Sequence, residues 1–196
     1  MTRHDALALA GAYFDDGRFF ADLSRRVALR TESDTGTVPP ALAAYLQGEL
    51  MPRLAPLGFD CEIAPNPAPG GGPFLIARRV EDPGLPTVLS YGHGDVVSGQ
   101  DALWRDGLSP WQLEARGERW YGRGTADNKG QHTIALGALE AVLQARNGRL
   151  GYNITWLIET GEEADSPGLE DLCEARCRQL AAVLFMQAIT LFENGF

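Results

Sequence analysis

Short apolar runs with the character of β-strands alternate along this chain with longer segments of helical periodicity. We expect strands over residues 74–80, 87–91 and 153–158, since each run is brief, apolar and followed by glycine or acidic residues. Residues 128–145 carry apolar side chains at helical spacing. The alternation predicts an α/β fold with a largely parallel sheet flanked by helices. Ligands of such sheets bind beyond the carboxyl ends of the strands.

Further helices are expected on both sides of this region, the first from the spacing of its apolar residues and the other two from prolines at 39–40 and 167 that suit a first helical turn. They are expected over residues 6–29 with a break near 15–17, over 39–54 with a kink at Pro52, and over 167–182.

The composition excludes some classes of partner. The 196 residues carry a net charge of −9, whereas nucleic-acid binding needs clustered cations. The longest apolar run, residues 181–192, is too short to span a membrane and contains polar side chains. The three cysteines are too few for a disulfide framework. We therefore expect a cytoplasmic protein with neither a nucleic acid nor a membrane as partner.

A histidine and an aspartate, His93 and Asp95, follow the strand expected at residues 87–91. Side chains two positions apart in extended backbone share one face. A carboxylate that accepts from the second nitrogen of a metal-binding imidazole fixes the ring and makes it more basic. The alternative is a histidine and an aspartate that make only local hydrogen bonds.

A glycine-rich turn places Asp127 near the start of the helix expected at residues 128–145. The glycines permit a sharp turn, and an anion is favourable at a helix N-terminus. A simple helix cap remains an alternative. A phosphate-binding loop is excluded by spacing, because Lys129 precedes Gly130 rather than following a glycine and preceding Ser or Thr.

Two adjacent carboxylates, Glu162 and Glu163, follow the strand expected at residues 153–158. Adjacent anions in a site of low dielectric repel each other unless a cation holds them. A metal resolves this conflict, and one glutamate can bind it while the other takes a proton from water. The alternative is a solvated acidic loop, since Asp165 continues the charge.

Taken together, the three motifs supply imidazole and carboxylate ligands from separate strand ends of one sheet. This donor set suits Zn²⁺. Two ions about 3.5–4 Å apart, bridged by one carboxylate, would polarise a carbonyl and acidify water. The sequence therefore predicts a metal site that activates water.

The motifs resemble those of the M20 family of zinc metallopeptidases, which includes glutamate carboxypeptidase, carnosinase-type dipeptidases and acetylornithine deacetylase. The matching stretches are residues 91–97 (YGHGDVV), 121–130 (YGRGTADNKG) and 160–163 (TGEE), in the family's order and spacing. The likeness runs from residue 1 to about residue 182 and covers the N-terminal portion of the family's chain.

The resemblance implies a role for each of the five motif residues. His93 resembles a ligand of one zinc, and Asp95 resembles the carboxylate that orients this histidine. Asp127 resembles the carboxylate that bridges both zincs. Glu162 resembles the general base, and Glu163 resembles a ligand of the other zinc.

The resemblance also implies properties of the backbone, cofactor and partners. The peptide bond between Asp127 and Asn128 is expected to be cis. A complete site would hold two Zn²⁺ ions, with Co²⁺ or Mn²⁺ as alternatives. The substrate would be a small peptide or an N-acyl amino acid, and full-length relatives would form homodimers.

The chain departs from the family pattern after Glu163. The family has a further acidic ligand near position 187, where this chain has Gln187, and a distant histidine ligand for which no counterpart follows. Of the two other histidines, we expect His4 to lie in a disordered terminus and His132 to be a surface or packed residue.

These departures lead to an interpretation of the domain organisation. We interpret residues 1–182 as the N-terminal part of an incomplete catalytic domain without a lid domain. Residues 183–196 are an atypical tail that a truncated or frame-shifted coding sequence would explain. The expected function is metal-dependent hydrolysis of a peptide or amide bond, impaired in this form. The alternative is a non-catalytic fragment or a metal-binding scaffold.

Overall fold

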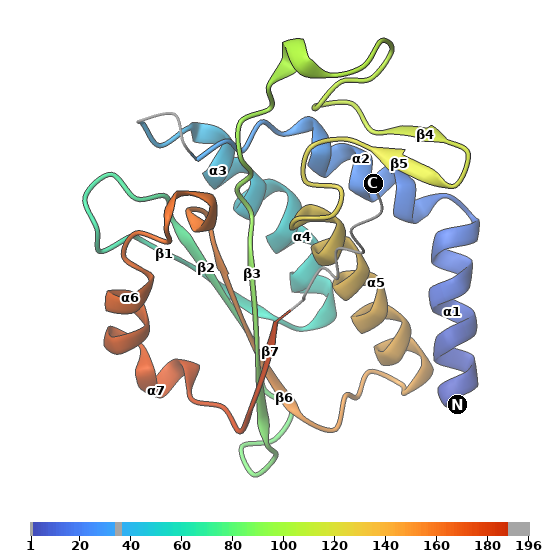
Figure 1. The fold of residues 1–196 in the computed structure, drawn as a ribbon. Helices are drawn as coiled ribbons and strands as arrows, with labels where there is room; N and C mark the ends of the chain where they lie inside the picture. Colours follow the sequence, from blue (N-terminus) through green and yellow to red (C-terminus); the bar gives the residue numbers. More distant parts are fainter. Residues whose placement is uncertain (1, 34–36, 188–196) are drawn as a thin grey trace.

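A five-stranded sheet forms the centre of the computed structural model, which describes residues 2–33 and 37–187 (Figure 1). The strands lie in the order β1 (Asp60–Ala64), β2 (Phe74–Arg79), β6 (Asn153–Glu159), β3 (Thr87–His93) and β7 (Leu184–Gln187). β3 pairs in parallel with both β6 and β7, whereas β2 is antiparallel to β1 and to β6. Four strands thus point in one direction and β2 in the other, which confirms the expected largely parallel sheet.

The expected helices are present, with different ends and breaks. The first one divides into α1 (Arg3–Asp15) and α2 (Arg18–Ala28) because Gly17 adopts a left-handed φ of +83° between them. The second contains a π-helix instead of a simple proline kink. It runs as α3 (Pro40–Ala44), the π-helix Tyr45–Leu50 and α4 (Met51–Leu54), and the later helices are α5 (Lys129–Ala145), α6 (Leu169–Ala175) and α7 (Cys177–Leu180).

Helices cover both faces of the sheet. Figure 1 shows α6 and α7 on one side, and α4, α5 and α1 on the other. On the α5 side, the core contains Tyr45, Leu46, Leu50, Leu75, Leu136, Ile154 and Trp156. On the α6 side, it contains Ala64, Phe74, Ile76, Leu157, Leu172 and Leu180. β6 is buried along its whole length because it contributes to both cores.

Besides β7, which lies in the segment expected as a tail, three strands have no counterpart among the expected ones. β1 lies at the edge of the sheet and is only partly buried, so it lacks the apolar run of an interior strand. β4 (Glu114–Arg116) and β5 (Arg119–Tyr121) form a separate short hairpin. The aromatic ring of Trp120 on β5 stacks on Phe14 of α1 at a centroid distance of 5.4 Å. This hairpin is therefore held by packing against the N-terminal helices.

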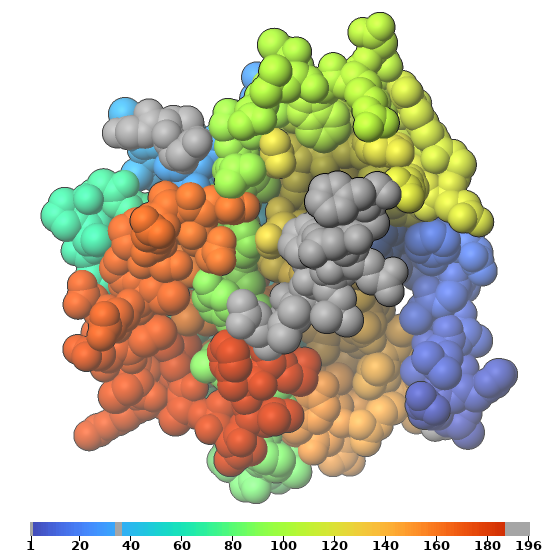
Figure 2. All heavy atoms as spheres, in the orientation of Figure 1, coloured from blue at the N-terminus to red at the C-terminus, as the bar shows by residue number. Residues whose placement is uncertain are grey.

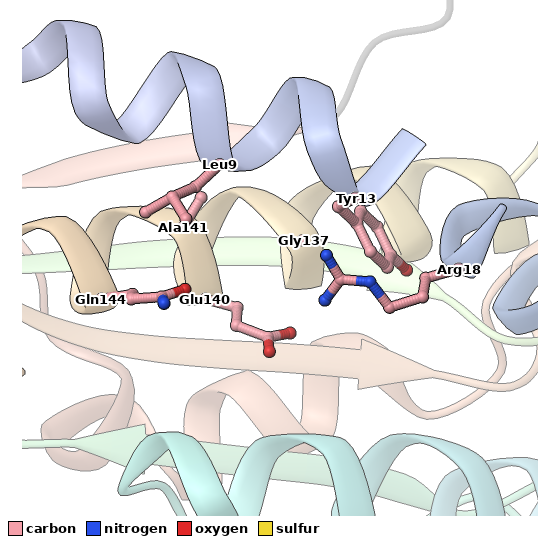
Figure 3. Close-up of a pocket in the computed structure, with 7 residues that line it drawn as sticks. All are labelled: Leu9, Tyr13, Arg18, Gly137, Glu140, Ala141 and Gln144. Atoms are coloured by element: carbon pink, nitrogen blue, oxygen red, sulfur yellow. The ribbon is translucent and has the colours of Figure 1, made fainter. Parts of the chain in front are cut away.

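A close seam joins α1 to α5 (Figure 3). A Cβ atom on Gly137 would lie 2.6 Å from the ring of Tyr13, so only glycine permits this approach. The hydroxyl of Tyr13 donates to Asp22 at 2.7 Å, which ties the seam to α2. Beside the seam is a cavity of about 20 Å³, lined by Leu9, Tyr13, Arg18, Gly137, Glu140, Ala141 and Gln144.

β7 is the least covered strand of the described sheet. Its apolar side chains Leu184, Phe185 and Met186 are 54%, 58% and 49% exposed, and the red segment of Figure 2 lies at the surface. The residues after Gln187 lie outside the described part of the chain, so the expected tail is described only at its start. None of the helices in the described ranges has the length and apolar character that crossing a bilayer requires.

Glu81 joins the end of β2 to the turn before β6. Its carboxylate accepts hydrogen bonds from the backbone amides of Leu150 and Gly151, and it pairs with Arg79. Burial would raise the pKa of Glu81, but these bonds outweigh it and lower the pKa from 4.5 to about 2. The ionised carboxylate therefore stabilises the folded chain.

Glu81→Gln is expected to destabilise the fold at pH 7 by about 1–3 kcal/mol, the usual effect of losing a charged hydrogen-bond partner. The loss of unfolding free energy relative to the unmodified chain should be largest above about pH 4.5. It should shrink as the pH falls towards 2, because the pKa of Glu81 is lower in the folded chain than in the unfolded chain. Urea unfolding at several pH values measures it. Glu174→Gln, at an exposed position of α6, is the control. An equal loss for both variants would contradict the prediction.

Candidate metal centre

The carboxyl ends of two neighbouring strands bring the histidine motif (residues 91–97) beside the acidic motif (residues 160–163). β3 and β6 are parallel, and His93 at the end of β3 lies opposite Glu159 at the end of β6. The backbone amide of Gly94 then donates to the carbonyl of Glu159 at 2.8 Å. The chain beyond β6 turns into the short 3₁₀ helix Glu162–Ala164. The parallel register thus sets Glu162 and Glu163 next to His93.

The glycine-rich turn before α5 supplies Asp127. Gly124 has a φ of +79°, which favours glycine. The amide of Gly130 donates to the carbonyl of Gly124 at 3.1 Å and closes the turn. The peptide bond between Asp127 and Asn128 is cis, as the resemblance implies.

His93, Asp127 and Glu163 converge on one point. Each offers a ligand atom, and these three atoms all lie within 4.8 Å of one another. The Nε2 atom of His93 is 2.8 Å from Oδ1 of Asp127 and 3.9 Å from Oε2 of Glu162. His93 is buried, whereas the side chains of Asp127 and Glu162 are 47% and 41% exposed. The cluster is therefore anchored in the protein and open to solvent on its carboxylate side.

Asp95 is fully buried and contacts three parts of this centre. Its Oδ1 lies 3.3 Å from Nδ1 of His93 and accepts from the amide of Glu162 at 3.2 Å. Its Oδ2 accepts from the amide of Glu163 at 3.0 Å and from the hydroxyl of Ser33 at 2.7 Å. The carboxylate therefore contacts both the imidazole ring and the backbone that carries the two glutamates.

The charges of the cluster shift the pKa values of its members. Burial lowers the pKa of His93, but the hydrogen bonds to Asp127 and Asp95 outweigh it and raise the pKa to about 10. The hydrogen bond to His93 lowers the pKa of Asp127. Burial raises the pKa of Glu163, and the charges of Asp127 and Glu162 add to this effect. The cluster thus has an excess of negative charge around one imidazole.

This donor set fits a divalent metal ion. One imidazole nitrogen and carboxylate oxygens are ligand types that bind Zn²⁺, and ligand atoms on one tetrahedral ion lie about 3–4 Å apart. The separations of up to 4.8 Å in the cluster are close to that range. A divalent cation would also neutralise the carboxylates that surround Nε2 of His93.

Several residues near the centre were not recognised from the sequence. The sequence around Ser33 did not indicate that this residue belongs to the centre, because its partner Asp95 is 62 positions away. Glu159 is buried, and its Oε1 accepts from the hydroxyls of Tyr91 and Ser166. The acidic run at residues 159–163 was the only indication of it.

Two buried side chains of α5 interact electrostatically with residues of the centre, Lys129 with Asp95 and His132 with His93. Lys129 is fully buried, and its Nζ donates to the carbonyl of Leu29 at 2.6 Å. Burial lowers the pKa of Lys129 to about 7. Nδ1 of His132 shares a hydrogen bond of 2.7 Å with the hydroxyl of Tyr45. His132 is therefore a packed residue outside the cluster of His93, Asp127 and Glu163.

Three other residues named from the sequence are not members of the cluster found among the described residues. His4 was expected in a disordered terminus, which is wrong: it is an exposed residue of α1, whose start is fixed by a capping box between Thr2 and Asp5. Gln187 ends β7 and lies opposite Tyr91 of β3 in the register. Glu193, the only acidic residue of the sequence after position 187, is outside the described residues.

Comparison with known proteins gives consistent results. The sequence profile of Peptidase family M20/M25/M40 matches residues 89–193. The chain is 34% identical over 125 residues to a cysteinylglycine-S-conjugate dipeptidase of Corynebacterium striatum, a match that covers 63% of this chain and 26% of that protein. It is 35% identical over 133 residues to a human Beta-Ala-His dipeptidase, covering 64% and 25%. The chain spans about a quarter of the length of these curated relatives.

Solved structures show the same similarity. The fold matches that of human carnosine dipeptidase 1 with a TM-score of 0.81 and 26% identity, covering 96% of this chain and 41% of that one. It matches an M20 family metallo-carboxypeptidase from Sulfolobus solfataricus with a TM-score of 0.73 and 26% identity, covering 86% and 36%.

Proposed function

Because this chain belongs to peptidase family M20/M25/M40, we propose that it acts in metal-dependent hydrolysis of a peptide or amide bond. The observation that carries the proposal is the convergence of His93, Asp127 and Glu163, whose ligand atoms lie within 4.8 Å of one another. They come from three separate segments that the fold joins at one edge of the sheet.

The three side chains would together coordinate two metal ions. His93 would bind one ion, Glu163 the other, and Asp127 would bridge them. Zn²⁺ is the metal that this donor set suits best, with Co²⁺ and Mn²⁺ as alternatives. When bound, the ions would polarise the carbonyl of the scissile bond and make water more acidic.

The other residues of the centre would move the proton and hold the geometry. Glu162 is the general base: its exposed carboxylate, 3.9 Å from Nε2 of His93, would take a proton from water and pass it to the leaving nitrogen. Asp95, at Nδ1 of His93, would keep Nε2 directed at the cluster. Its bonds to the amides of Glu162 and Glu163 would keep those side chains beside the histidine.

The substrate class comes from the relatives. Two of them are named as dipeptidases, for cysteinylglycine conjugates and for Beta-Ala-His. We accordingly assign a small peptide or an N-acyl amino acid as the substrate. The open carboxylate side of the cluster leaves room for such a molecule to approach.

Metal analysis and a panel of dipeptides test the proposal. We expect the purified chain to bind Zn²⁺ and to hydrolyse a member of the panel at an impaired rate, and Glu162→Gln to reduce that rate by about a further 10²–10⁴-fold, the usual contribution of a general base, without loss of metal. Glu170→Gln, at an exposed position of α6, is the matched control and should keep full activity. Failure of the unmodified chain to bind any divalent metal would overturn the proposal.

A second candidate function is metal binding without catalysis. It is favoured by Gln187, which stands where the family resemblance implies a further acidic ligand. Stoichiometric Zn²⁺ binding with no hydrolysis of any dipeptide would support this candidate over the first. Turnover that depends on Glu162 would exclude it.

A further inference from the structure

The segment between α2 and α3 runs alongside the residues that follow His93. The amide of Val96 donates to the carbonyl of Thr31 at 2.9 Å, and the amide of Ser33 donates to the carbonyl of Val96 at 3.4 Å. Glu32 forms a parallel bridge with Val96, and its carboxylate accepts from the amide of Gly99 at 2.8 Å. Residues 31–33 are thus tied to the backbone on the carboxyl side of Asp95.

This pairing directs the hydroxyl of Ser33 at Oδ2 of Asp95, 2.7 Å away. An ionised carboxylate has about four lone-pair positions for hydrogen-bond donors. At Asp95 they are met by Ser33, by the amides of Glu162 and Glu163, and by Nδ1 of His93. Because Asp95 is fully buried, these four groups rather than bulk water satisfy its carboxylate.

The four contacts have different origins. Two are backbone amides of the turn that carries the glutamates, and one is the imidazole. Ser33 alone comes from the N-terminal part of the chain, and its hydroxyl is the side-chain donor to Oδ2. Without it, Asp95 loses one of the four contacts that fix its orientation, and His93 and the amides of Glu162 and Glu163 have a less firmly held acceptor.

We propose that Ser33 is a positioning residue of the metal centre, which acts through Asp95 on His93 and on the Glu162–Glu163 backbone. The effect of Ser33 on metal binding rests on the proposed function. Its effect on the orientation of the Asp95 carboxylate does not depend on a metal.

The chain offers a matched control in the same segment. Thr31 is fully buried, and its hydroxyl has no hydrogen-bond partner among the described residues. Thr31→Val removes that hydroxyl and keeps the side-chain shape. It therefore reports the effect of altering this segment without touching Asp95.

Two measurements on the whole 196-residue chain test the proposal. The first is the Zn²⁺ affinity, by competition with a chelator. Ser33→Ala should weaken it about tenfold, at the low end of the range for groups that support metal ligands. Ser33→Thr, which restores the hydroxyl, should return it to within about twofold, and Thr31→Val should leave it unchanged.

The second measurement is amide hydrogen exchange of the metal-free chain. Exchange at Glu162 and Glu163 should become at least about threefold faster in Ser33→Ala and stay unchanged in Thr31→Val, because only the first variant loosens their acceptor. Ser33→Cys, which keeps the size with a weaker donor, should fall between Ser33→Ala and the unmodified chain.

The outcomes separate this proposal from the proposed function. Unchanged exchange and unchanged Zn²⁺ affinity in Ser33→Ala, with the unmodified chain binding Zn²⁺, would overturn the positioning role alone. Equal losses in Ser33→Ala and Thr31→Val would also overturn it, since they would show a general effect of the segment. Faster exchange in Ser33→Ala, with no Zn²⁺ binding by any form, would support the positioning of Asp95 and contradict the metal centre.

Discussion

Asp127→Ala should lower the Zn²⁺ affinity of the chain at least about 100-fold, the largest effect on metal binding that we expect from one substitution. Asp127 is the carboxylate closest to Nε2 of His93, at 2.8 Å, and belongs to the group that includes Glu163. If it bridges two ions, its loss weakens both positions at once. Isothermal titration with Zn²⁺ measures the change.

Asp106→Ala provides the control for this experiment, because it removes an exposed carboxylate outside the cluster and changes the net charge equally. It should leave the Zn²⁺ affinity within about twofold, as expected for an exposed charge screened by salt. Equal affinities of Asp127→Ala and Asp106→Ala would show that the ions bind elsewhere on this acidic chain.

Gly130→Ala should destabilise the folded chain by about 3 kcal/mol or more. Overpacking usually destabilises a protein by about 1–3 kcal/mol, and the effect is largest where the added atom meets backbone that cannot move aside. A Cβ atom at this position would lie 1.9 Å from the carbonyl oxygen of Thr125. The backbone at residues 124–130 would have to open, and that would displace Asp127. Urea unfolding should therefore show a lower midpoint, and Zn²⁺ affinity should fall as well.

Gly11→Ala is the matched substitution in another helix. Nothing lies within 4 Å of a Cβ atom built on Gly11, and the residue is exposed on α1. We expect stabilisation by about 0.5–1 kcal/mol, since alanine loses less backbone entropy than glycine in a helix. If Gly130→Ala were as stable as Gly11→Ala, the turn before α5 would not have the close packing described.

The sequence was sufficient for the interior elements of this fold. The expected strands at residues 87–91 and 153–158 correspond to β3 and β6, and the helix expected at 128–145 corresponds to α5. These elements are buried, so their apolar periodicity is strong. β1 and the β4–β5 hairpin lack a continuous apolar face, and no local pattern in the sequence distinguished the π-helix Tyr45–Leu50 from an α-helix.

Much of the spatial convergence of the candidate centre was also predictable, since parallel strands present their carboxyl ends at one edge. This accounts for His93 beside the Glu162–Glu163 turn. The contact of Ser33 with Asp95 was not predictable, because it depends on how a segment without regular structure pairs with residues 62 positions away. The roles that we assign to the five motif residues stay predictions until metal binding and hydrolysis are measured.

The pairing of β3 with β6 has a consequence for how the protein is made. Glu163 follows β6 and is about 70 residues further along the chain than His93, so the ribosome completes the glycine-rich turn and all of α5 before it adds the last of the three side chains. A nascent chain shorter than this lacks one of the three side chains of the cluster. If the cluster binds an ion as proposed, the complete site can form only after β6 has emerged and inserted between β2 and β3.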